Sequence, residues 1–186
     1  MNTSSVYFLI GVFVLVLALT SVAWHFSLRA RRSSRLSWES IVNRLVWVDP
    51  KIVAEIALDL VHESGEPGKV PGREGLDSAR IWEMIGGLEG LKNLRSNSQV
   101  LIDLAAHLQR RYPEALVVAE ELRLDARELE WHVGRLEGAA GTGNLEISFP
   151  FYAQRAVATY YRMTRQLLTL YAQKNLSMLA DLEKSL

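Results

Sequence analysis

The sequence predicts an all-α protein in which a single N-terminal transmembrane helix is followed by an antiparallel helical bundle. Two observations indicate this class. Residues Val6 to Trp24 form an unbroken run without a charged side chain. From Trp38 onward, apolar residues recur at helical spacing, and no segment shows the sustained alternation typical of a strand. The predicted parts are an anchor at 1–28, a basic segment with short helices at 29–63, a linker at 64–76 and a cytoplasmic bundle at 77–186.

The run from Val6 to Trp24 has the length of a membrane span. As a helix it would measure roughly 28 Å, which is close to the hydrocarbon thickness of a bilayer. No Lys or Arg precedes the run, whereas four arginines follow it closely: Arg29, Arg31, Arg32 and Arg35. By the positive-inside rule, we expect the N-terminus outside the cell membrane and the bulk of the chain in the cytoplasm. The alternative is a cleaved signal peptide, which the uncharged start and the long apolar run disfavour.

The formal net charge of the chain is zero only because these four arginines balance an acidic remainder. The whole chain carries 21 basic and 21 acidic residues, so 17 positive charges face 21 negative ones from Ser37 onward. A mildly acidic body argues against a nucleic-acid partner, whereas the basic segment favours contact with the lipid bilayer. Trp38 is a candidate for the membrane interface beside these arginines, although burial of Trp38 and Trp47 between helices is the favoured interpretation. The chain contains no cysteine, which excludes disulfides and thiol chemistry.

Two short helices and a linker are expected before the main bundle. Ser37 is a typical N-cap for the first helix. Asp49 followed by Pro50 predicts the start of the second, because proline is preferred at the first helical position. That helix should run to about Glu63. Residues 64–75 contain four glycines and two prolines, which indicates a loop.

The main bundle is predicted from long helical patterns. The first begins after Asp77 and reaches Leu108, with Asn97 and Ser98 as a candidate interruption. Pro113 separates it from the second, since the residue before a proline disfavours helical geometry. The second carries a nearly regular heptad stripe of apolar residues. Its members are Ala115, Val118, Leu122, Ala126, Leu129, Val133 and Leu136.

A glycine-rich break and a third, aromatic helix follow. Residues 138–144 predict the break, and the third helix is expected from Ser148 or Pro150 to about Lys174. Ser177 predicts the cap of a short last helix that reaches Leu186.

Glycines inside the first two long helices require an explanation, because each costs about 1 kcal/mol relative to alanine. If the two helices form a hairpin, Gly86, Gly87 and Gly90 lie opposite Ala139, Gly138 and Arg135, with Gly134 one position further on. Close approach of the two backbones is one interpretation. The alternative is that Gly86 ends or kinks a helix and that Gly138 begins a loop. The two interpretations are equally favoured.

No sequence motif indicates catalysis, a cofactor or a metal ion. The four histidines (His25, His62, His107 and His132) do not have metal-site spacing, and no His-Glu-x-x-His motif occurs. The glycines of residues 138–143 lack the strand and the Lys-Ser or Lys-Thr of a nucleotide-binding loop. We therefore predict no catalytic residue, no cofactor-binding residue and no metal ligand.

The third long helix predicts a surface for a protein partner or for self-association. Its aromatic residues point around the helix in more directions than one core face can bury, and aromatic patches are enriched at protein interfaces. The candidate residues are Phe149, Phe151, Tyr152 and Tyr161. The leading hypothesis is a membrane-anchored scaffold, adaptor or assembly component. The alternative is a membrane-associated enzyme or ligand-binding bundle that uses groups such as His107, Glu128, His132 or Tyr160.

Overall fold

Every regular element that the structure describes is a helix, which confirms the all-α class and the helical bundle. The structure is a computed structural model that describes residues 7, 11–17, 20–21, 37–64, 76–109, 111–174 and 176–186. The chain divides into two compact units, Met1–Ser37 and Trp38–Leu186. Of the predicted membrane span, only Tyr7, residues 11–17 and residues 20–21 are described. None of the described helices is both long enough and apolar enough to cross a membrane.

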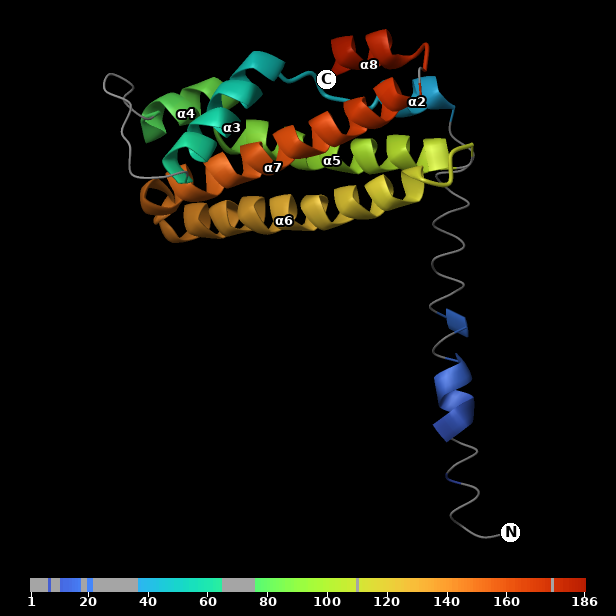
Figure 1. The fold of residues 1–186 in the computed structure, drawn as a ribbon. Helices are drawn as coiled ribbons and strands as arrows, with labels where there is room; N and C mark the ends of the chain where they lie inside the picture. Colours follow the sequence, from blue (N-terminus) through green and yellow to red (C-terminus); the bar gives the residue numbers. More distant parts are fainter. Residues whose placement is uncertain are drawn as a thin grey trace. The chain divides into compact units, whose positions relative to one another are not determined.

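Three long helices form the body of the second unit, and α7 is central to it (Figure 1). This helix contacts α3, α4, α5, α6 and α8. The short connections between α5, α6 and α7 make successive long helices antiparallel, as predicted. The helices of this unit are α2 (Trp38–Val42), α3 (Pro50–Ser64), α4 (Ser78–Ile85), α5 (Gly87–Gln109), α6 (Ala115–Thr142), α7 (Leu145–Gln173) and α8 (Leu179–Ser185).

The starts of α3 and α4 follow from local sequence. Pro50 is the first residue of α3, and the Asp49 Oδ1 accepts a hydrogen bond of 2.9 Å from the Lys51 backbone N–H. Asp77 directly precedes α4, although its side chain makes no capping hydrogen bond. The predicted start of α7 is wrong by several residues, because the helix begins at Leu145 and includes Pro150.

The predicted interruption at Asn97 and Ser98 is also wrong. The break lies at Gly86, whose backbone is left-handed (φ 75°), while α5 continues through both polar residues. Asn97 is buried and holds the connection between α2 and α3. Its Oδ1 accepts from the Val46 N–H at 2.9 Å, and its Nδ2 donates to the Val46 carbonyl at 2.7 Å and to the Tyr160 hydroxyl at 3.2 Å. The residue that seems to interrupt the apolar pattern therefore fixes a connection between two helices.

The core lies where the apolar stripes of the long helices meet. The heptad stripe predicted on α6 faces inward, since six of its seven residues are buried and Val118 packs against the core at its edge. From α7, Tyr160 and Tyr171 are fully enclosed. Burial raises the pKa of both hydroxyls to about 12. The apolar inner face of α6 is thus buried against the other helices of the bundle. A function in binding would therefore depend on the outer face of α6.

Candidate interaction surface

The predicted membrane-interface residues differ in what the structure describes. Arg29, Arg31, Arg32 and Arg35 lie outside the described residues. Trp38 is half-buried, and its indole Nε1–H donates to the Tyr171 hydroxyl at 3.2 Å. The favoured interpretation of burial therefore accounts for Trp38. It is wrong for Trp47, which is 68% exposed.

The interpretation of the glycines as a close contact between two long helices is wrong. A Cβ atom at Gly134 or at Gly138 would meet no atom within 4 Å, so no neighbouring backbone approaches either residue. Gly86 ends α4, as the alternative interpretation expected. At Gly90, a Cβ would come within 1.6 Å of the Ile85 carbonyl oxygen, so the close approach is to the adjoining turn. Gly138 does not begin a loop, because α6 continues to Thr142.

An aromatic cluster with two arginines lies where the second half of α6 meets the first half of α7. The ring of Tyr152 lies 5.5 Å from that of Trp131 and 5.1 Å from that of Phe151, both in edge-to-face geometry. The Arg135 guanidinium lies over Trp131 and Tyr152, and the Arg155 guanidinium lies 4.5 Å from the Phe151 ring centre. We call these five residues the aromatic–arginine cluster.

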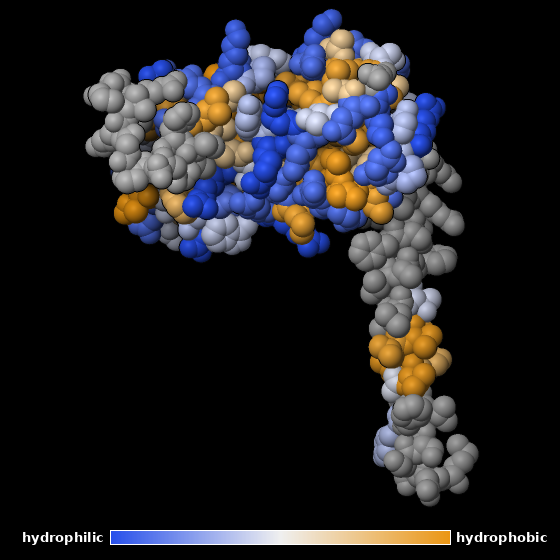
Figure 2. All heavy atoms as spheres, in the orientation of Figure 1, coloured by the Kyte–Doolittle hydropathy of each residue, from blue (hydrophilic) through white to orange (hydrophobic). Residues whose placement is uncertain are grey.

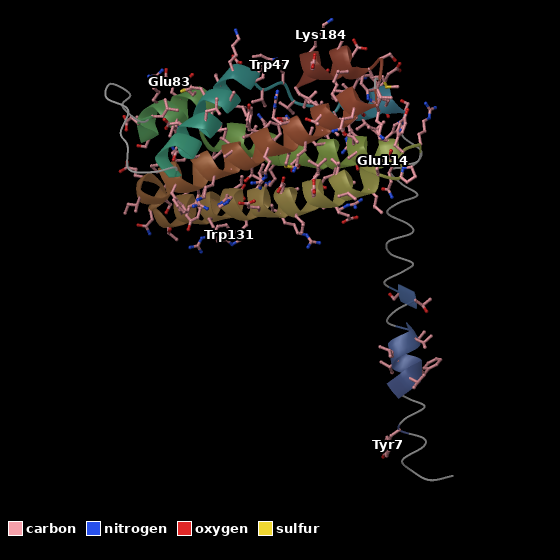
Figure 3. All side chains as sticks on the ribbon, in the orientation of Figure 1. Tyr7, Trp47, Glu83, Glu114, Trp131 and Lys184 are labelled. Carbon is pink, nitrogen blue, oxygen red and sulfur yellow. The ribbon has the colours of Figure 1, made fainter. Side chains whose placement is uncertain are left out.

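The cluster faces solvent. Trp131 is 55% exposed and Phe151 52% exposed, and Figure 3 shows Trp131 pointing from α6 away from the other helices. Both arginines are exposed, and within the described part of the chain neither forms an ion pair. Tryptophan, tyrosine and arginine are the residues enriched among the energetic centres of protein interfaces. Stacking on aromatic rings leaves the guanidinium N–H groups available to an anionic partner.

His132 lies beneath the cluster. Its ring is 5.0 Å from that of Trp131, and its Nε2 is 3.6 Å from the Glu128 Oε1. Both ring nitrogens are buried without a hydrogen-bond partner in the described structure. Burial lowers the pKa of His132, and the neighbouring Arg155 lowers it further, although Glu128 opposes both effects. The neutral imidazole therefore packs against the rings of Trp131 and Tyr152.

Arg162 fixes α7 against α6 beside the cluster. Its Nε and Nη2 donate to the two oxygens of Asp125 at 3.1 and 2.8 Å, and Nη2 also donates to Glu128 at 2.8 Å. Hydrogen bonding to Asp125 is the main reason that the pKa of Arg162 is raised. A planar guanidinium held by two carboxylates fixes the register of the two helices. The cluster thereby lies on two helices that this ion pair links.

The candidate partner residues on α7 do not form one patch. Phe151 and Tyr152 belong to the aromatic–arginine cluster. Phe149 is buried and packs edge-on against Trp82 of α4, so it is not available to a partner. Tyr161 lines a separate shallow hollow of about 490 Å³ between α6 and α7. Its charged lining residues are Glu121, Arg162 and Arg165.

Trp131, Arg135 and Arg155 are not among the residues predicted from the sequence. The available signal was a second apolar stripe on α6, since Val117 and Leu124 precede Trp131 at intervals of seven residues. Val117 is 61% exposed and Leu124 63% exposed, so this stripe runs along the outer face of the helix.

The groups proposed for an enzyme belong to three helices: His107 to α5, Glu128 and His132 to α6, and Tyr160 to α7. His132 and Glu128 lie together on α6, whereas the Tyr160 hydroxyl is bonded to Asn97. A hollow of about 260 Å³ lies between α3, α4 and α5, and its lining, which includes Trp47, Ile52 and Met84, is mainly apolar. Across the described residues, no group of three or more His, Asp or Glu side chains is placed to hold a metal ion. No family profile, curated protein or solved structure matches this chain.

Proposed function

We propose that this protein is a single-pass membrane protein whose helical bundle acts in the cytoplasm by binding another protein, as a scaffold, adaptor or assembly component. The observation that carries the proposal is the exposed aromatic–arginine cluster. Its three rings and two guanidinium groups combine large apolar area with positive charge that forms no ion pair among the described residues. Exposed aromatic rings beside arginines are the composition typical of protein interaction surfaces.

The membrane anchor is supported by the apolar run and by the part of it that the structure describes. Phe13 is 64% exposed, and the neighbouring residues 12 and 14–17 are exposed as well (Figure 2). The Thr20 hydroxyl donates to the Val16 carbonyl at 2.7 Å. In lipid, polar groups of a helix must find partners within the protein, and this bond provides one.

The anchor is tested on the full-length protein in membranes. We expect it to remain in the membrane fraction after washing with alkaline carbonate. Because the chain has no cysteine, Ser4→Cys and Ser177→Cys introduce unique thiols near the two ends. In intact cells, an impermeant maleimide should label the first variant and not the second. Release by carbonate, or labelling of Ser177→Cys alone, contradicts the proposed anchor or its orientation.

The interaction surface is tested by affinity purification after crosslinking in membranes. The double variant Trp131→Ala, Phe151→Ala removes both exposed rings of the cluster and leaves the core of α6 and α7 intact. Trp47→Ala is the matched control, because it removes an exposed tryptophan that does not belong to the aromatic–arginine cluster. We expect the double variant to lose specific crosslinked species and the control to keep them. An unchanged set of crosslinked species in the double variant contradicts the proposal.

A further inference from the structure

We propose that the partner of this surface is a second copy of the chain, bound through the outer face of α6 and α7 in an antiparallel, two-fold symmetric arrangement. The inference rests on the proposed function and names its partner. Three features of the face support it: an apolar stripe, a protruding cluster matched by a hollow, and one pair of opposite charges.

The apolar stripe gives the register. In an antiparallel pairing that sets Leu124 against Trp131 of the partner, the same operation sets Trp131 against the partner's Leu124. Val117 then faces the partner's Gly138, where the space around the missing side chain is open. The seven-residue spacing keeps all of these contacts on one face of α6. Gly138, where an added Cβ would meet none of the described atoms within 4 Å, is thereby placed in the contact between chains.

The hollow lies on the same face as the cluster but at its other end. Phe151 of the cluster and Thr169 of the hollow are eighteen residues apart on α7, which is five helical turns, so they point in the same direction. The Arg162–Asp125 pair sets the second half of α7 beside the first half of α6. A two-fold axis that crosses the middle of the face therefore brings the cluster of each copy to the hollow of the other. One surface with a protrusion at one end and a recess at the other is what an isologous dimer requires.

One pair of opposite charges agrees with this register, whereas Arg165 of the hollow would lie near the partner's Arg155. Glu121 lines the hollow, and within the described residues it has no ion-pair partner. In the proposed pairing it lies across from Gly134 of the partner, one residue from the partner's Arg135, and symmetry provides this contact twice. Near the axis, Arg127 and Glu128 of the two copies bring together equal numbers of opposite charges, and Glu128 is already bonded to Arg162.

The size of the face is sufficient for a weak dimer. Residues 117–138 extend roughly 32 Å along α6, and two adjacent helices are about 20 Å wide, which gives about 600 Å² for each copy. Specific interfaces bury about 800 Å² for each partner, with transient ones below that. Attachment to one membrane raises the local concentration of such chains, so a weak contact is enough.

The first experiment is a charge exchange in the full-length protein in detergent, with the dimer fraction measured by analytical ultracentrifugation. Glu121→Arg or Arg135→Glu alone should weaken the dimer roughly tenfold, because two attractive contacts become repulsive. The combination of both substitutions should restore it. Glu130→Arg changes the same charge on α6 away from the face and should have no effect. Circular dichroism establishes that each variant is folded.

The second experiment tests the register in membranes. Differently tagged Leu124→Cys and Trp131→Cys chains are expressed together and oxidised, and every disulfide must come from the introduced thiols because the natural chain has none. We expect mixed dimers to exceed the dimers formed by either variant alone. A monomer in both experiments, or preferential pairing of Leu124→Cys with itself, overturns the inference. If the Trp131→Ala, Phe151→Ala variant still loses crosslinked species of other proteins, the proposed function survives that failure.

Discussion

Replacement of Asn97 by alanine should destabilise the bundle by about 3 kcal/mol. The side chain is 1% exposed and makes three hydrogen bonds, two with the Val46 backbone and one with the Tyr160 hydroxyl. Each such bond contributes about 1 kcal/mol net, and a buried hydroxyl left without its partner adds to the loss. Val46 lies in the connection between α2 and α3, so the substitution also releases that connection.

The assay is urea unfolding followed by circular dichroism, on a chain that begins at Ser37. This chain contains every core residue of the second unit. With a denaturant slope of about 1.5 kcal/mol per molar, a loss of 3 kcal/mol lowers the midpoint by about 2 M. The amide proton of Val46 should also exchange faster with solvent.

Ser98→Ala is the matched control for Asn97→Ala. Ser98 is equally buried, but its hydroxyl donates only to the Arg95 carbonyl of its own helix. We expect this variant to lose less than 1 kcal/mol. Tyr160→Phe should lose about 1 kcal/mol, and its effect should not add fully to that of Asn97→Ala, because the two residues share a bond. Equal effects of the Asn97 and Ser98 substitutions would refute the assigned role of Asn97.

Three further predictions concern packing, backbone and protonation, and each is measured by denaturation of the same chain. Leu129→Ala leaves a cavity at a fully buried position and should lower the free energy of unfolding by about 2–5 kcal/mol. Gly134→Ala should stabilise α6 by up to about 1 kcal/mol because its Cβ enters open space, whereas Gly90→Ala should destabilise because its Cβ meets the Ile85 carbonyl oxygen. The lowered pKa of His132 means that the unfolded chain binds its proton more readily, so stability should fall as the pH drops through 6.5 and below, and His132→Phe should reduce this slope.

The sequence was sufficient for the helices whose determinants are local or periodic. Pro50 begins α3 because its fixed backbone suits the first helical position. The heptad stripe of α6 is buried because helical periodicity places its residues on one side. Both statements depend on the chain alone and not on what packs against it.

Other features depend on contacts between distant segments, and sequence reasoning did not reach them. Asn97 breaks an apolar pattern, and only the position of Val46, fifty-one residues earlier, shows why a polar group is buried there. The sequence allowed the glycines of the two long helices to be placed opposite one another. Nothing in the local sequence indicates that Gly134 faces open space. Trp47 has the composition of a core residue, and its exposure results from the path of the connection that Asn97 holds.

Only part of the candidate site was predicted from the sequence, because its residues belong to two helices. Phe151 and Tyr152 were predicted from the aromatic content of α7 alone. Trp131 and Arg135 joined them only when Arg162 and Asp125 fixed the register between α7 and α6. A search for a second apolar stripe on the same helix would have found Trp131 without a structure.

The two stripes of α6 allow folding and assembly to be separated by substitution. A helix with one apolar face can bury that face entirely within its own bundle. In α6, the buried stripe does this. The outer stripe makes no contribution to that core, so Leu124→Gln should change the free energy of unfolding by less than about 0.5 kcal/mol. If the outer stripe binds a partner, the same substitution should weaken association. A variant that unfolds normally but no longer associates would place the function of α6 on its outer face, and a large loss of stability would show that this face belongs to the core.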